Sequence, residues 1–240
     1  LGGVPVNNLP YAVQENLILP VFRTQDAALL SALAQENGRT ARVHIKIDTG
    51  LGRIGVEKGE QLEELLDGIL PLKGLEIEGV FTHFGEAEVT DPEFTEIQIS
   101  RFEEALGQIR ARGIQPRYIH ATNTPSTVRF KKAHYNMIRT GLLWLGYDPC
   151  LDEDNRLGLE TVLEWKTFLT NKKYVLSGRS MGYWRSFTAK RDTVVGIACF
   201  GYGDGYLEDL GKKGGYVLIH GKRAPIISVC MDQTFLDITD

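Results

Sequence analysis

The residues best suited to chemistry stand where short strand-like runs of the sequence end. Four such runs lie before Gly141, and their ends carry Lys46 and Asp48, Thr82 and His83, His120 leading to Asn123 and Thr124, and Arg139. Glycines lie beside these ends, so backbone amides could approach an anion such as a phosphate. Because the strand ends of a parallel α/β barrel share one rim, where active sites are built, the pattern predicts a site there.

Each of these residues alone also has a structural interpretation. A single histidine in a strand is usually a satisfied structural residue, Lys46 could simply be ion-paired, and Arg53, in a glycine-rich turn, could lie on the surface. The joint pattern favours a site, because four strand ends on one rim would each need a separate explanation. In the second half, Tyr202 stands between glycines and Met231 precedes Asp232. A tight turn around Tyr202 and a strand end at Met231 would be purely structural interpretations, and the residues alone leave these and a functional interpretation equally open.

The elements that must position these residues follow a simple alternation before Gly141. Strands are predicted at 17–22, 43–48, 79–84, 118–121 and 136–139, and helices at 27–35, 60–70 and 92–112, with a brief helical turn at 125–130. Such alternation predicts parallel strands joined by crossover helices.

After Leu142 the pattern of expected secondary structure changes. Strand-like runs at 194–199, 215–220, 224–229 and 234–239 are separated by glycine-bearing turns, and helical periodicity is absent. This predicts a mostly antiparallel β domain. We place the boundary within 145–160, which gives domains at 1–150 and 151–240.

Composition excludes several classes of protein. The formal net charge is −4, without the basic footprint of a nucleic-acid-binding protein. No apolar run approaches the ~20 residues of a membrane span. The three cysteines lack metal-ligand spacing and favour a reducing, cytoplasmic setting. We therefore expect no metal, no nucleic acid and no membrane as partners.

The motifs, taken in order, resemble those of the alanine racemase family. They are HIKIDTGLGRIG (44–55), GVFTHF (79–84), HATN (120–123), YNMIRTG (135–141), FTAKRDT (187–193), GYGDGY (201–206) and RAPIISVCMDQ (223–233). The resemblance implies a (β/α)8 barrel that carries pyridoxal 5'-phosphate, followed by a β domain. It also implies a head-to-tail homodimer in which each site joins the barrel rim of one subunit to the β domain of the other. The implied activity is racemisation of alanine, which supplies D-alanine for peptidoglycan.

The resemblance assigns roles residue by residue. Arg139 would face the pyridine nitrogen of the cofactor and, because arginine does not readily give up a proton, keep that nitrogen unprotonated. Arg53 would lie near the cofactor's phenolic oxygen and the substrate carboxylate, and Lys46 is at a position often carbamylated. Tyr202 would remove the α-proton of the L-enantiomer, with His83 of the other subunit hydrogen-bonded to it.

The remaining implied contacts concern phosphate and carboxylate groups. Those expected to hold the cofactor and its phosphate are Asn123, Thr124, Gly141 and Leu142, with Thr124 where serine is usual. Met231 would offer its backbone amide to the substrate carboxylate, with Asp232 beside it.

The sequence departs from the family pattern in three respects. The string around the cofactor-binding lysine of the first barrel strand is absent, and about five strands precede the β domain where a barrel needs eight. We therefore expect a partial barrel (about strands 4–8) and a β domain that is also truncated, and we expect these 240 residues alone to be inactive. Gly182-Tyr183-Trp184 replaces the usual S-Y-G. Alternatives are another amino-acid racemase, for serine, lysine or a broad set, and an inactive cofactor-binding homologue.

Overall fold

The computed structural model describes residues 2–149 and 157–240 and divides the chain into two compact units, Leu1–Leu163 and Glu164–Asp240. Each unit is described by itself below. The predicted boundary between residues 150 and 151 lies outside the described residues and stays a prediction.

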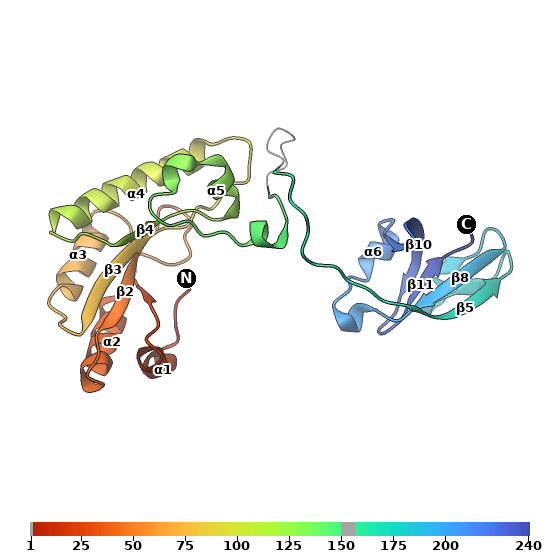
Figure 1. The fold of residues 1–240 in the computed structure, drawn as a ribbon, viewed down its shortest axis with the longest axis horizontal. Helices are drawn as coiled ribbons and strands as arrows, with labels where there is room; N and C mark the ends of the chain where they lie inside the picture. Colours follow the sequence, from red (N-terminus) through yellow and green to blue (C-terminus); the bar gives the residue numbers. More distant parts are fainter. Residues whose placement is uncertain (1, 150–156) are drawn as a thin grey trace. The chain divides into compact units, whose positions relative to one another are not determined.

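The first unit is built on a parallel sheet (Figure 1). Its strands are β1 (Leu19–Val21), β2 (Ala41–Lys46), β3 (Leu75–Phe81) and β4 (Tyr118–His120), in the order β1-β2-β3-β4. Its helices are α1 (Leu9–Gln14), α2 (Thr24–Glu36), α3 (Glu60–Ile69), α4 (Glu93–Ala111) and α5 (Thr124–Arg129). The predicted parallel α/β arrangement is confirmed.

The core of this unit lies between the helices and one face of the sheet. Alternate residues of β2, Val43 and Ile45, are fully buried there against the apolar stripes of the helices, which include Leu62, Leu66, Phe102 and Leu106. Each stripe repeats every three to four residues, so a helix buries it by lying along the sheet. The opposite face of the sheet carries His44, Lys46, Phe81, Tyr118 and His120, and we call it the polar face.

One predicted strand of this unit is wrong. Residues 136–139 do not form a strand, so the sheet of the described residues has four strands rather than five. The side chain of Asn136 explains the difference: its Oδ1 accepts from the Ile119 amide at 2.7 Å and its Nδ2 donates to the Arg117 carbonyl at 2.7 Å. A side-chain amide thus occupies backbone groups of β4 that a neighbouring strand would have used.

The second unit is an antiparallel sheet, as predicted. Its strand order is β5-β8-β11-β10-β9, made of β5 (Leu169–Val175), β8 (Thr193–Ala198), β9 (Tyr216–Ile219), β10 (Lys222–Val229) and β11 (Thr234–Asp237). A two-stranded ribbon of β6 (Ser180–Met181) and β7 (Phe187–Thr188) and a single helical turn, α6 (Asp209–Lys212), complete it. The sequence analysis missed β5, whose first six residues are all exposed and show no apolar alternation. It also missed the ribbon and α6.

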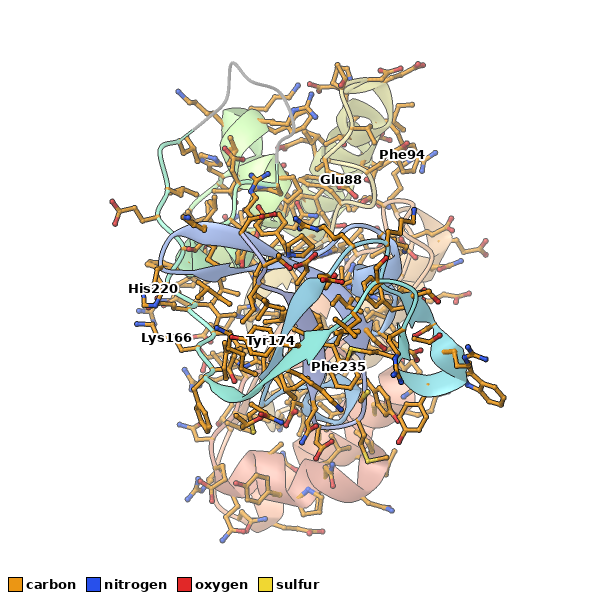
Figure 2. The ribbon with its side chains drawn as sticks, turned by 90° about the vertical axis from the view of Figure 1, so that its right-hand side faces the viewer. Glu88, Phe94, Lys166, Tyr174, His220 and Phe235 are labelled. Carbon is orange, nitrogen blue, oxygen red and sulfur yellow. The ribbon has the colours of Figure 1, made fainter. Side chains whose placement is uncertain are left out.

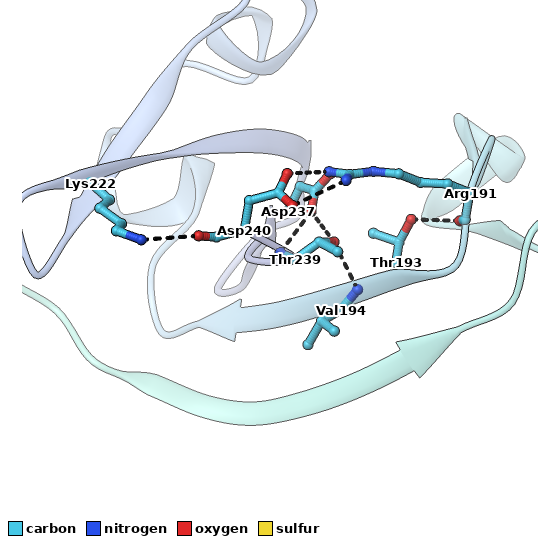
Figure 3. A network of polar contacts seen from close by, with 7 residues as sticks. All are labelled: Arg191, Thr193, Val194, Lys222, Asp237, Thr239 and Asp240. Atoms are coloured by element: carbon cyan, nitrogen blue, oxygen red, sulfur yellow. Dashed lines mark hydrogen bonds and ion pairs between the residues drawn. The ribbon is translucent and has the colours of Figure 1, made fainter.

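Packing and ion pairs hold this second sheet together. Phe235 of β11, labelled in Figure 2, packs with Val195 and Ile197 of β8, whereas Tyr174 of β5 is 75% exposed. Beside β8, Arg191 pairs with Asp237 and Asp240 (Figure 3), which lowers the pKa of the Asp240 carboxyl. These contacts tie the start of β8 to the chain beyond β11.

Among the described residues, no helix is long and apolar enough to cross a membrane. The same residues contain no cluster of three or more histidine, cysteine, aspartate or glutamate side chains that could hold a metal ion.

Candidate active site

Arg139 is the centre of a hydrogen-bond network at the carboxyl ends of β3 and β4. Its Nη1 donates to His120 Nδ1 at 2.7 Å, and its Nη2 lies 3.1 Å from His83 Nδ1. Nη2 also lies 2.9 Å from the Thr82 carbonyl and 3.0 Å from the Ala121 carbonyl. All these partners are neutral acceptors. The guanidinium is therefore held in place without a carboxylate among the described residues.

Burial and neighbouring cations keep the two histidines neutral. Desolvation, followed by the charge of Arg139, lowers the pKa of His120 to about 3 and that of His83 to about 4. Desolvation lowers the pKa of Arg139 itself to about 10, so it remains charged at neutral pH. Since a guanidinium only donates, each histidine must present an unprotonated Nδ1 to it.

Lys46 ends β2 on the polar face and is only 1% exposed. Its Nζ donates to the Ile47 carbonyl at 2.7 Å. Desolvation lowers the pKa of its amine to about 8, opposed by Asp48 and assisted by Arg139 and Arg53. Lys46 is therefore a buried amine with an appreciable uncharged fraction at neutral pH.

The glycine-rich turn after β2 holds Arg53 on its exposed side. Asp48 Oδ1 accepts from the amides of Gly50 at 2.9 Å and Gly52 at 3.2 Å, which closes the turn. Gly55 is required there, since it has a φ of +121° and an added Cβ would lie 2.7 Å from the Asp48 nitrogen. The positive charge of Arg53 contributes to lowering the pKa values of Lys46 and His83.

Helix α4 fixes this turn relative to β3. Gln98, fully buried, donates to Thr49 Oγ1 at 3.2 Å and accepts from the Gly85 amide at 3.0 Å. Phe94, labelled in Figure 2, packs where a Cβ on Gly50 would meet it at 3.0 Å. One helix thus positions the segments that carry Arg53 and His83.

A second group of predicted residues meets after β4. Asn123 caps α5 by accepting from the Ser126 amide at 3.2 Å, and its Nδ2 donates to the Phe84 carbonyl at 3.3 Å. Thr124 Oγ1 accepts from the amides of both Gly141, at 2.9 Å, and Leu142, at 3.2 Å. A hydroxyl and two amides therefore converge at one point.

The predicted residues of the second unit also lie together. The 3-10 turn Tyr202–Asp204 packs on the strand end after β10, because the Tyr202 amide donates to the Cys230 carbonyl at 3.0 Å and the Gly203 amide to the Met231 carbonyl at 2.8 Å. A Cβ on Gly201 would lie 2.1 Å from the Cys230 carbonyl, so glycine is needed for this approach. Tyr202 is 44% exposed, and Met231 and Asp232 are exposed beside it.

Beside Tyr202 lies an open groove of about 880 Å³, which Tyr183, Trp184 and Ser228 help to line. Trp184 is 98% exposed and has a φ of +59°. This left-handed backbone costs a non-glycine residue about 1 kcal/mol. A glycine at this position would adopt the same backbone without that cost.

Comparison with known proteins agrees with this arrangement. Residues 1–149 match the family model described as "Alanine racemase, N-terminal domain", and residues 162–240 match "Alanine racemase, C-terminal domain". The chain belongs to the alanine racemase family. It is 34% identical to the alanine racemase of Desulforamulus reducens over 99% of this chain. It spans 65% of the length of that relative.

Solved structures of the family share the fold. The alanine racemase of Bacillus anthracis with bound L-Ala-P is 29% identical, with a TM-score of 0.86 over 100% of this chain and 62% of its own. The alanine racemase of Streptomyces coelicolor A3(2) is 28% identical, with a TM-score of 0.90 over 99% of this chain and 63% of its own.

Against this family background, the structure brings together most of the residues singled out in the sequence. Arg139, His83 and Lys46 meet around the polar face, and Thr124, Gly141 and Leu142 meet after β4. The sequence analysis assigned no role to His120, although its position at a strand end was the available signal. It also missed Gln98 and Glu78, whose helix and strand patterns give no sign of a buried polar role.

Proposed function

We propose that this chain supplies much of the active site of an alanine racemase, which interconverts L-alanine and D-alanine with pyridoxal 5'-phosphate. The observation that carries the proposal is the state of Arg139: a partly buried, charged guanidinium whose partners are His120, His83 and backbone carbonyls. Such a cation, fixed at the carboxyl ends of parallel strands, is suited to hold a group that must not receive a proton.

The described residues fit the cofactor in two respects. Arg139 Nε is buried without a hydrogen-bond partner among them, and the charges of Arg139 and Arg53 both act on His83, so the region is positively charged. Separately, the amides of Gly141 and Leu142 converge on Thr124 Oγ1, whose own hydroxyl proton remains available, and a phosphate oxygen would replace Oγ1 as the acceptor of these amides. Both features match a group with a pyridine ring and a phosphate.

The chain's own residues would then have distinct tasks. When bound, pyridoxal 5'-phosphate withdraws electrons from the amino acid and acidifies its α-proton. Arg139 would face the pyridine nitrogen, which it cannot readily protonate, and Arg53 the substrate carboxylate. The phosphate would be held by Thr124, Gly141 and Leu142, with Asn123 fixing α5. Met231 and Asp232 would lie at the substrate carboxylate.

Tyr202 would exchange the α-proton on the L-face. A tyrosine has a pKa near 10 and needs a cationic neighbourhood to act as a base at neutral pH. We infer a homodimer in which His83 of one subunit, held neutral with its Nδ1 toward Arg139, donates its Nε2–H to the Tyr202 oxygen of the other and so favours the phenolate. The parallel sheet would be part of the family's (β/α)8 barrel, so the barrel would contribute His83 to this pair.

Lys46 would be carbamylated. Its amine is deprotonated more readily than that of an exposed lysine, and the free amine is the form that attacks carbon dioxide, forming an N–C bond and releasing one proton. The resulting negative charge would orient Arg53. Incubation with ¹³C-bicarbonate should give a carbamate carbon signal that Lys46→Ala abolishes.

Racemisation of L-alanine and D-alanine by the intact protein tests the proposal. We expect exchange in both directions, dependent on added pyridoxal 5'-phosphate and lost in Arg139→Ala, with serine and lysine turned over more slowly. Turnover of serine or lysine in preference to alanine would overturn the assignment of substrate, and absence of any racemisation would favour an inactive homologue. The product would supply D-alanine for peptidoglycan in the cytoplasm.

A further inference from the structure

Two buried polar atoms face each other beneath the Arg139 network. His44 Nε2 and Glu78 Oε2 are 3.8 Å apart, and neither has a hydrogen-bond partner among the described residues. Glu78 is only 4% exposed, and its other oxygen lies 3.5 Å from Arg42 and 3.8 Å from Arg117. The two arginines offset the cost of burying the carboxylate through Oε1, but Oε2 is left facing His44.

A β-bulge turns Glu78 toward His44. In the pairing of β2 with β3, Val43 lies opposite Ile77 and His44 opposite Gly79, so Glu78 is an extra residue. Ile77 and Val80 both pack in the helix-side core although they are three residues apart, an odd spacing that places residues of a regular strand on opposite faces. The bulge therefore puts Glu78 on the polar face, which fits the use of bulges to re-aim side chains near active sites.

Gly79 leaves the space that His44 needs. A Cβ at this position would lie 2.7 Å from His44 Nε2 and 2.8 Å from two ring carbons. The imidazole thus lies directly over the glycine backbone, with one nitrogen toward Glu78. Its other nitrogen, Nδ1, lies 2.8 Å from His120 Nε2.

The protons of this chain of residues can be arranged in only one direction. Arg139 donates to His120 Nδ1, so the proton of neutral His120 is on Nε2 and points to His44. His44 Nδ1 must then accept, which excludes a doubly protonated His44 and leaves its own proton on Nε2, facing Glu78. The N–H groups of Arg139 and His120 thus each donate to the next residue, and the last N–H, on His44, faces the Glu78 carboxylate 3.8 Å away.

We propose that Glu78 and His44 are positioning residues for Arg139, because they hold His120 in the tautomer that accepts from the guanidinium. Glu78 supplies the terminal acceptor that selects the Nε2–H form of His44. His44 in turn supplies the acceptor that selects the Nε2–H form of His120. Its consequence for turnover rests on the proposed racemase function, whereas the proton arrangement itself does not.

Nitrogen-15 NMR of the histidine rings in the intact protein tests the arrangement directly. At pH 7 we expect His44 and His120 both to carry a protonated Nε2 and an unprotonated Nδ1. His134 is an internal control outside the network, because its Nε2 lies 2.8 Å from the Thr127 carbonyl and must be the protonated nitrogen. A His120 protonated at Nδ1, or a doubly protonated His44, would overturn the proposal.

Two pairs of variants separate positioning from simple packing. Glu78→Gln keeps an acceptor at this position, whereas Glu78→Met keeps length without one; only the second should mix the tautomers of His44. His44→Asn keeps an acceptor about where Nδ1 lies, whereas His44→Leu removes it; only the second should disturb the ring signals of His120. Equal spectra for both members of each pair would contradict the assignment, as would His134 signals that change alongside them.

Turnover provides the second measurement. We expect Glu78→Met and His44→Leu to lower kcat about tenfold with little change in KM, as loss of an orienting partner does elsewhere, and the conservative variants to restore most of it. Failure of the racemase proposal would leave the ring-nitrogen signals as expected. Racemisation in a protein whose ring nitrogens differ from this pattern would instead refute the positioning role alone.

Discussion

At the scale of single residues, the candidate site keeps His120 and His83 uncharged so that they accept hydrogen bonds from Arg139. This lowers the stability of the fold at low pH. His120 and His83 have pKa values of about 3 and about 4, far below the ordinary value of 6.5. Between those values and 6.5, the unfolded chain binds protons that the folded chain does not. Falling pH therefore favours unfolding in this window.

We expect the free energy of unfolding of the first unit to fall as the pH drops from about 6.5 toward 4, by up to about 1.4 kcal/mol per pH unit for each histidine. His120→Asn, which retains an acceptor near Nδ1 but does not titrate, should reduce that slope by one histidine's share. Urea denaturation followed by far-UV circular dichroism at several pH values measures it. An unchanged slope in the variant would show that His120 is already protonated in the fold.

Thr124 offers a second residue-scale test. Its hydroxyl accepts from the Gly141 and Leu142 amides, so Thr124→Val, of the same shape, should cost about 1 kcal/mol by removing the acceptor of two partly exposed amides, whereas Thr124→Ser should be close to neutral. The same valine variant should weaken binding of pyridoxal 5'-phosphate, measured by absorbance titration. Equal affinity in both variants would separate Thr124 from the phosphate.

At the scale of elements, sequence patterns predicted what depends on local periodicity. The apolar stripe of α3 and the capped length of α4 were visible, and so were the strand ends that carry Lys46, His83 and Arg139. The bulge at Glu78 could not be predicted, because the extra residue is defined only by the pairing of β3 with β2. Residues 136–139 have a strand-like composition but form no strand. The Asn136 side chain, instead of a backbone ladder, hydrogen-bonds to the segment at β4.

Because the Asn136 side chain bonds where a neighbouring strand would otherwise pair, Asn136 should contribute to stability. Asn136→Ala would leave the Ile119 amide and the Arg117 carbonyl without this partner, and because both bonds are exposed and water can take their place, we expect a loss of about 1 kcal/mol. Asn8→Ala is the matched control, since Asn8 is exposed and makes no side-chain cap bond at α1, and it should change stability by under about 0.5 kcal/mol. Urea denaturation compares the two. Equal losses would show that water replaces the Asn136 amide at no cost.

At the scale of the whole molecule, the predicted residues are divided between two compact units. Arg139, His83 and Thr124 belong to Leu1–Leu163, whereas Tyr202 and Met231 belong to Glu164–Asp240. No pattern along the chain can say whether the proposed site would take both groups of residues from one subunit or from two. The family resemblance implies a homodimer in which each site joins residues of both subunits.

Mixing two inactive variants of the intact protein decides between these arrangements. Suppose each site takes Arg139 from one subunit and Tyr202 from the other. A heterodimer of Arg139→Ala with Tyr202→Phe then has one site with both changes and one site with neither. Random reassortment makes half of the dimers heterodimers, so activity should return to about a quarter of the wild-type value. If both residues of a site came from one subunit, every site would keep one change and mixing would restore nothing. Racemisation measured before and after reassortment in mild denaturant, with size-exclusion chromatography to verify the dimer, distinguishes the two results.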